Sequence, residues 1–132
     1  MKKITLALAA LFFTVCGYSQ TTLSLCAYVS NDGYCAFNNN KFITTPDSAT
    51  GRVFMKVNSE VSLGTKLTYK IFALNSKGEE TLSESFSQDI KPDWLFAWMP
   101  YPFPTNSKYN IKIYNDADKL LCSKAFELVA GK

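Results

Sequence analysis

The sequence of 132 residues contains no histidine. Histidine is the commonest general base and metal ligand, so nucleophile systems that pair serine or cysteine with histidine are excluded. The six glycines are scattered and form no phosphate-binding loop. Carboxylates such as Glu79 and Glu80 lie beside a turn, where solvated surface charge is the ordinary interpretation. We therefore expect no enzyme activity, no cofactor and no metal site.

Arginine is nearly absent as well, because Arg52 is the only one in the chain. Proteins that bind nucleic acid usually present a concentrated basic face rich in arginine, so a nucleic-acid partner is not expected. The net charge of the whole chain is only +3. After residue 15 no apolar run is long enough to cross a bilayer, and no membrane insertion is expected for that part.

Residues 1–19 have the features of a secretory signal peptide. Two lysines follow the first methionine, residues 4–15 form an apolar run, and small residues at Gly17 and Ser19 suit a cleavage site. The run is shorter than the roughly 20 apolar residues of a membrane span. Removing nineteen residues from 132 leaves 113, which fits one domain.

The sequence thus predicts a mature protein of residues 20–132 that is secreted or periplasmic. A lipoprotein anchored at Cys16 is the alternative. The residue before a lipidated cysteine is normally small, however, and here it is Val15. Soluble export is therefore preferred.

The exported part has the pattern of β-structure almost throughout. Leu67, Tyr69 and Ile71 alternate with polar residues, and period two is typical of a half-buried strand. No ten-residue stretch has a helical stripe. The predicted strands are Thr22–Val29, Tyr34–Phe37, Lys41–Thr44, Arg52–Asn58, Lys66–Leu74, Thr81–Ile90, Lys108–Tyr114 and Leu120–Val129. Seven to eight short strands in one small domain predict an all-β fold, an immunoglobulin-like antiparallel β-sandwich.

Three cysteines lie in the exported part. Cys26 and Cys35 flank the turn Ser30–Gly33, so both belong to one predicted hairpin. In an oxidising compartment one disulfide is expected, with one thiol left over. Cys26–Cys35 is the preferred pairing, although the register of a tight hairpin would place a later residue opposite Cys26. A bridge from either of them to Cys122 is the alternative.

The most unusual segment is Trp94–Pro104, which holds both tryptophans and three prolines. Trp94, Phe96 and Trp98 share one face of the alternating part. The first interpretation, which we prefer, places these three side chains in the core and lets the proline-rich part cross between sheets.

In the second interpretation the aromatic face is exposed and forms a ligand-binding surface, because flat rings suit sugars and protein interfaces. Its candidate residues are Trp94, Phe96, Trp98, Tyr101 and Phe103. Of these, the tip that contains Tyr101 and Phe103 is expected to be the more exposed. Lys91, Asp93 and Asn106 would provide a polar rim.

The C-terminal third resembles known proteins at the level of fold. A strand with an early tyrosine, Lys108–Tyr114, is followed by the acidic turn Asn115–Asp118 and by a strand, Lys119–Phe126, that closes on phenylalanine. This is similar to the last hairpin of bacterial exported immunoglobulin-like domains of the Bacteroidetes type. The leader ending Tyr18-Ser19-Gln20 also resembles the leaders of proteins exported by that bacterial group. The resemblance implies architecture and no activity. The Cys…Trp…Cys arrangement of antibody domains is missing.

The function expected from these features is that of an exported, non-catalytic binding or protein-interaction module. Its partner would be a protein or polysaccharide of the cell envelope or the extracellular space. The first alternative is a carbohydrate-binding domain that uses the aromatic segment Trp94–Phe103. A further alternative is an inhibitor of an extracellular enzyme.

Overall fold

The computed structural model describes residues 21–131, so the predicted signal peptide and Cys16 lie outside the described residues. The strands of the described part are β1 (Thr21–Cys26), β2 (Tyr28–Val29), β3 (Cys35–Ala36), β4 (Lys41–Thr44), β5 (Thr50–Ser59), β6 (Lys66–Leu74), β7 (Glu80–Asp89), β8 (Phe96–Pro104), β9 (Ser107–Tyr114) and β10 (Leu120–Ala130). The all-β prediction is therefore confirmed. Each predicted strand is present, but Thr22–Val29 is divided into β1 and β2, and β8 lies in a segment that was not predicted as a strand.

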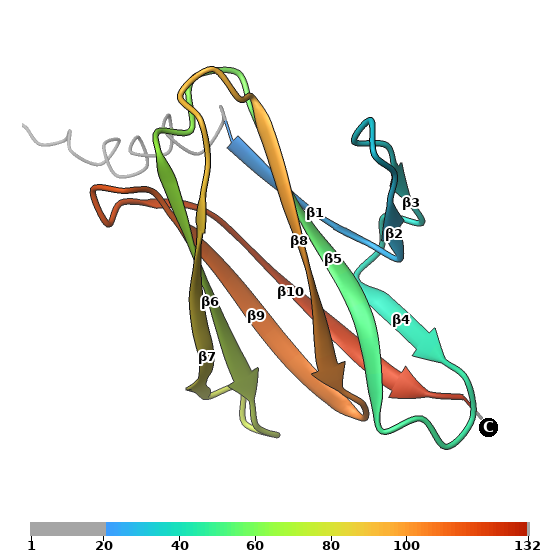
Figure 1. Ribbon diagram of the computed structural model, residues 1–132. Helices are drawn as coiled ribbons and strands as arrows, with labels where there is room; N and C mark the ends of the chain where they lie inside the picture. Colours follow the sequence, from blue (N-terminus) through green and yellow to red (C-terminus); the bar gives the residue numbers. More distant parts are fainter. Residues whose placement is uncertain (1–20, 132) are drawn as a thin grey trace, which may run out of the picture.

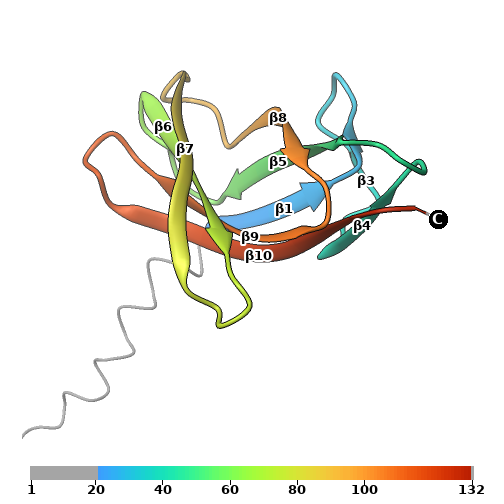
Figure 2. The ribbon, with the colours of Figure 1, turned by 90° about the horizontal axis from the view of Figure 1, so that it is seen from below.

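Two sheets pack face to face, as in a β-sandwich (Figure 1 and Figure 2). One has the strand order β1-β5-β8 and the other β4-β10-β9-β6-β7, while β2 and β3 form a separate two-stranded hairpin. The prediction of a wholly antiparallel sandwich was wrong at one place, because β4 pairs with β10 in parallel. The chain leaves the first sheet after β1, makes the hairpin, and joins the edge of the second sheet running in the direction of β10.

The core lies between the two sheets and follows from alternation along the strands. Every second side chain of a strand points to the same face, so one apolar set per strand is enough to fill the space between the sheets. The innermost side chains are Leu25, Val53, Met55, Val57, Leu67, Tyr69, Ile71, Phe103, Ile111, Ile113 and Leu128. The predicted inward face of β6, formed by Leu67, Tyr69 and Ile71, is thus confirmed.

Two hairpins of the second sheet use the same turn. In the β6–β7 turn the side-chain oxygen of Asn75 accepts hydrogen bonds from the backbone of Lys77 and Glu79, both at 2.9 Å. Asn115 does the same in the β9–β10 turn. The position that needs a positive φ is Gly78 in the first turn (82°) and Asp118 in the second (60°). A residue with a Cβ is strained in that conformation, so Asp118 makes the second turn less stable than a glycine would.

Candidate functional site

The aromatic segment forms strand β8 at an edge of the three-stranded sheet, paired with β5 along its whole length. Its buried residues are Ala97 and Phe103, and the alternate positions, which include Phe96 and Trp98, point away from the core. The preferred interpretation, in which Trp94, Phe96 and Trp98 fill the core, was therefore wrong. The small side chain of Ala97 and the residues beyond Trp98 provide the inward face instead.

The expectation for the proline-rich part was also wrong. It does not cross between the sheets, because an edge strand tolerates proline where its missing N–H faces away from the sheet. Phe103 was expected at an exposed tip, but it is fully buried, with ring centroids 4.9 Å from Phe126 and 5.1 Å from Tyr109. Tyr101 is half-buried, and its ring stacks on Phe86 at 5.6 Å. Neither residue belongs to an exposed aromatic face.

The other three candidate residues come together around an open hollow of about 720 Å³. This volume is in the range of roughly 300–1,000 Å³ that is usual for ligand sites. Trp94 and Leu95 precede β8, and Trp94 is fixed by a turn in which its N–H donates to the carbonyl of Lys91 at 3.0 Å. The hollow is lined by Asn31, Gln88, Asp93, Trp94, Leu95, Phe96, Ala97 and Trp98. Below, we call it the β8 hollow.

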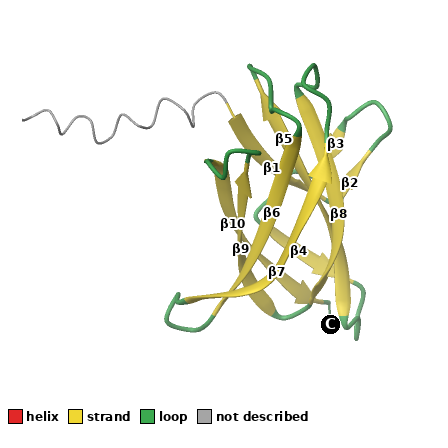
Figure 3. Cartoon of the chain, turned by 60° about the vertical axis from the view of Figure 1, so that its left-hand side comes forward, coloured by secondary structure: helices red, strands yellow, loops and turns green. Residues whose placement is uncertain are grey.

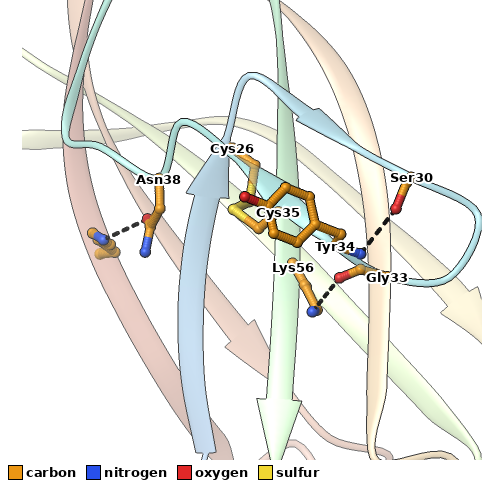
Figure 4. Close-up of a disulfide and its surroundings, with 8 residues drawn as sticks. Cys26, Ser30, Gly33, Tyr34, Cys35, Asn38 and Lys56 are labelled. Carbon is orange, nitrogen blue, oxygen red and sulfur yellow. Dashed lines mark hydrogen bonds between the residues drawn. A yellow bond between two sulfur atoms is a disulfide. The ribbon is translucent and has the colours of Figure 1, made fainter.

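The tip of the hairpin β2–β3 contributes Asn31 to the lining of the β8 hollow, and the sequence pattern did not predict this role. Cys26 and Cys35 are joined by a disulfide, so the preferred pairing is confirmed (Figure 4). Cys35 lies opposite Val29 in the hairpin rather than opposite Cys26. The strand therefore breaks at Ala27, between β1 and β2, which the sequence pattern had shown as one continuous run.

The tip of this hairpin is held against β5 and β8. The ammonium group of Lys56 on β5 donates to the carbonyl oxygen of Gly33, as Figure 4 shows, and lies 5.0 Å from the centre of the Phe96 ring. A Cβ at Gly33 would lie 2.7 Å from a carbon of Phe96, so a larger residue there would force this ring to shift. Since Gly33 also has a φ of +88°, two independent constraints favour glycine there.

The aromatic rings of the β8 hollow face one another. Phe96 and Trp98 stack with their ring centroids 5.9 Å apart and an interplanar angle of 16°. The far end of the hollow is formed by Gln88 of β7, whose amide donates to the Trp98 carbonyl at 3.2 Å and accepts from the Tyr69 hydroxyl at 2.7 Å. Gln88 thus links the two sheets, and burial raises the pKa of the Tyr69 hydroxyl above its usual range.

The charged residue in the lining of the hollow is acidic, and the Lys56 cation lies against the ring of the lining residue Phe96. Asp93 lies in the lining, and Asp32 follows the lining residue Asn31 at the hairpin tip. A hydrogen bond from the Ser30 hydroxyl lowers the pKa of Asp32, so this carboxylate is ionised at neutral pH. Of the expected polar rim only Asp93 is in place. Asn106 lies in the β8–β9 turn, where its side chain accepts a hydrogen bond from the backbone of Ala130.

Other chemistry is not assembled in residues 21–131, where no group of three or more acidic or cysteine side chains is placed to hold a metal ion. Cys122 carries a free thiol, and burial raises its pKa to about 12, which leaves it protonated and unreactive at neutral pH. Within the same residues no helix is long and apolar enough to cross a membrane. Neither a protein-family model nor a curated protein sequence matches the chain.

Proposed function

We propose that the protein is an exported, non-catalytic interaction module that binds a partner protein at the β8 hollow. The observation that carries this proposal is the exposure of three consecutive large apolar side chains at its mouth. Trp94, Leu95 and Phe96 are 38, 51 and 39% exposed. Scattered apolar residues are normal on a surface, but adjacent ones around a hollow are typical of an interface.

The hairpin β2–β3 extends the apolar surface. Tyr28, Tyr34 and Phe37 are all exposed on it, and the Tyr28 ring packs edge-on against Phe54 of β5 at 5.5 Å. Tyrosine, tryptophan and phenylalanine are enriched in protein interfaces, because they bury much area at little cost in side-chain entropy. The disulfide and the Lys56 contact fix this surface in advance, which lowers the ordering cost of binding.

The acidic rim indicates the chemistry of the partner. Asp32 and Asp93 lie near the hollow, and the cation of Lys56 is already engaged by the Gly33 carbonyl. A basic side chain that accompanies an apolar one would therefore complement the site, and the exposed faces of Trp94 or Trp98 could also receive a cation.

Carbohydrate binding is the second candidate. Asn31 and Asp93 beside Trp94 provide the combination of polar groups and an aromatic ring that a sugar requires. We place it second because Phe96 and Trp98 turn their faces toward each other instead of forming one flat platform. An enzyme inhibitor usually inserts a protruding segment into an active site, whereas the β8 hollow is concave, so the inhibitor hypothesis receives less support.

Three features support the finer parts of the proposal. The order β1-β5-β8 facing β10-β9-β6-β7 is that of an immunoglobulin-like sandwich with an additional edge strand. Tyr109, near the start of β9, donates its hydroxyl to the carbonyl of Pro104 at 2.6 Å, which is the tyrosine corner of such domains. The disulfide Cys26–Cys35 suits an oxidising compartment and thus agrees with export through the leader.

The proposal is tested by placing a photo-crosslinking amino acid at Leu95 in the exported protein of the source organism. The matched control carries the same amino acid at Ile43, which is 71% exposed on β4, outside the lining of the hollow. We expect a protein crosslink from position 95 and none from position 43. The purified partner should then bind the Leu95→Asp variant at least about tenfold more weakly than the wild type and the Ile43→Asp variant equally well.

Three results would count against protein binding at this site. The first is the absence of any crosslink from position 95, and the second is equal crosslinking from both positions. The third is retention on a polysaccharide gel that Trp94→Ala abolishes without lowering the thermal midpoint. This last result would establish the carbohydrate candidate instead.

A further inference from the structure

The two sheets end side by side in edge strands β8 and β7, which are treated differently (Figure 3). An edge strand presents unpaired N–H and C=O groups on which another strand can form a ladder, and proteins normally block such edges. One of these two edges is blocked and the other is not. The difference depends on which residues of each strand point their backbone groups outward.

In β8 the backbone N–H and C=O groups of the even-numbered residues point toward the free edge. Ser59 donates to the Leu95 carbonyl at 2.8 Å and Thr105 donates to the Ala49 carbonyl at 3.0 Å, so odd positions of this segment bond to the β5 side. In an antiparallel pair the bonded and non-bonded positions alternate. The outward positions are therefore Phe96, Trp98, Pro100, Pro102 and Pro104.

These outward positions are largely closed to a further strand. The three prolines have no N–H to offer. Of the outward carbonyls, that of Trp98 accepts from Gln88 and that of Pro104 accepts from Tyr109. The prolines, which the sequence pattern alone suggested as strand breakers, thus protect the edge of a continuous strand.

Strand β7 has the opposite character. Ile90 donates to the Thr65 carbonyl at 3.0 Å, so the even positions near this end bond to β6, and Ser85 and Ser87 direct their N–H and C=O groups outward. Both serines are exposed, and in the described part of the chain no backbone hydrogen bond covers them. The ten residues of β7 contain neither proline nor lysine. The ladder to β6 changes register between Glu84 and Leu82, so the regular open part of the edge begins at Ser85, where Ser85 and Ser87 offer both donors and acceptors.

The charge of β7 selects its occupant. Glu80, Glu84 and Asp89 are its only charged residues, so the strand carries acids and no base. Glu80 already pairs with Lys112 of β9 at 3.1 Å, which leaves Glu84 and Asp89 to act on a partner. A second copy of β7 would place acid against acid, which is unfavourable between neighbouring strands. A basic strand would gain both the ladder bonds and charge complementarity.

We propose that the free edge of β7 binds an extended, proline-free segment of a partner protein that carries alternating basic residues, and that this segment adds a strand to the five-stranded sheet. Main-chain hydrogen bonds to Ser85 and Ser87 hold the segment, and the carboxylate of Glu84 selects its charge. This binding surface adjoins the β8 hollow at Gln88, but it uses the backbone edge of β7 and does not depend on the function proposed for the hollow.

The test uses two synthetic peptides of the length of β7, ten residues, one alternating lysine with valine and the other glutamate with valine. The protein variants are Ser85→Pro/Ser87→Pro and the matched control Ser85→Ala/Ser87→Ala. The prolines remove two outward N–H groups without touching the ladder to β6, whereas the alanines remove only the hydroxyls. Thermal melts establish that both variants fold.

We expect the lysine peptide to slow amide hydrogen exchange at Ser85 and Ser87 and to bind about tenfold more tightly than the glutamate peptide. The proline variant should lose at least about tenfold in affinity, and the alanine variant should remain within about twofold of the wild type. The proposal is overturned if the lysine peptide leaves these amides unprotected or binds the proline variant normally. Leu95→Asp, which tests the β8 hollow, should leave peptide binding unchanged, so the two proposals fail separately.

Discussion

Replacing Phe103 and Phe96 by alanine, one at a time, tests the two faces of β8 with the same chemical change. Phe103 is fully buried and meets three other rings, those of Tyr101, Tyr109 and Phe126, with centroids at 4.8, 5.1 and 4.9 Å. Truncating a buried phenylalanine costs about 3–5 kcal/mol, and the loss of ring contacts places the expected cost of Phe103→Ala at about 4 kcal/mol.

Phe96 on the same strand is 39% exposed, so its truncation opens no closed cavity. Burying a whole side chain of this kind is worth about 1.5–3 kcal/mol. For the buried part of Phe96, together with its contacts to Trp98 and Lys56, we expect Phe96→Ala to cost about 1–1.5 kcal/mol. We therefore expect the two variants to differ by more than about 2 kcal/mol in unfolding free energy.

The difference is measured by urea unfolding of residues 20–132 with the disulfide intact, followed by far-ultraviolet circular dichroism. At about 4 °C or more per kcal/mol, Phe103→Ala should also melt on the order of 15 °C below the wild type. Equal losses for the two variants, or a loss below about 1.5 kcal/mol for Phe103→Ala, would show that the inward and outward faces of β8 are wrongly assigned.

Three further predictions concern single side chains. Tyr109→Phe removes the hydroxyl that bonds to the Pro104 carbonyl and should lower the unfolding free energy in urea by about 1–2 kcal/mol; no loss would contradict a stabilising role of this hydrogen bond. Asp118→Gly should raise the unfolding free energy by about 0.5–1 kcal/mol, since glycine adopts the φ of 60° without strain, and a lower stability would contradict the strain argument. The pKa of the buried Cys122 thiol is raised to about 12, so the unfolded chain ionises first and stability should fall as the pH rises above about 8.5. Unfolding free energies measured from about pH 7.5 to about pH 9.5, a range that brackets the pKa of a free thiol, should fall with pH. The Cys122→Ala variant should lose this pH dependence, and the same dependence in both proteins would assign it to other groups.

Much of the fold could be predicted because its signals are local. The alternation of Leu67, Tyr69 and Ile71 requires a half-buried strand wherever that strand lies. The turn Ser30–Gly33 brought Cys26 and Cys35 near one another without reference to the rest of the chain. These features depend on neighbours in sequence, and they were correct.

The candidate site was predictable only in part. The segment that holds Trp94 and Trp98 was identified from its composition, but its two faces were assigned wrongly. The segment is apolar on both faces, so periodicity could not say which face meets the core. The contact of Gly33 with Phe96 joins residues 63 positions apart, and no local pattern could have revealed it.

By itself the sequence determined most of the strands and their turns and made Cys26–Cys35 the preferred disulfide, because backbone geometry and short loops act over a few residues. Only the tertiary structure decided that Phe103 is buried and Phe96 is not, since this depends on which sheet lies across from β8. Tertiary packing likewise placed the hairpin tip beside the tryptophans. It also left β7 at an open edge while the prolines of β8 closed the neighbouring one. The position of a strand within a sheet is set by long-range pairing. That pairing decides whether an alternating strand faces the core, lines the hollow or lies at a free edge.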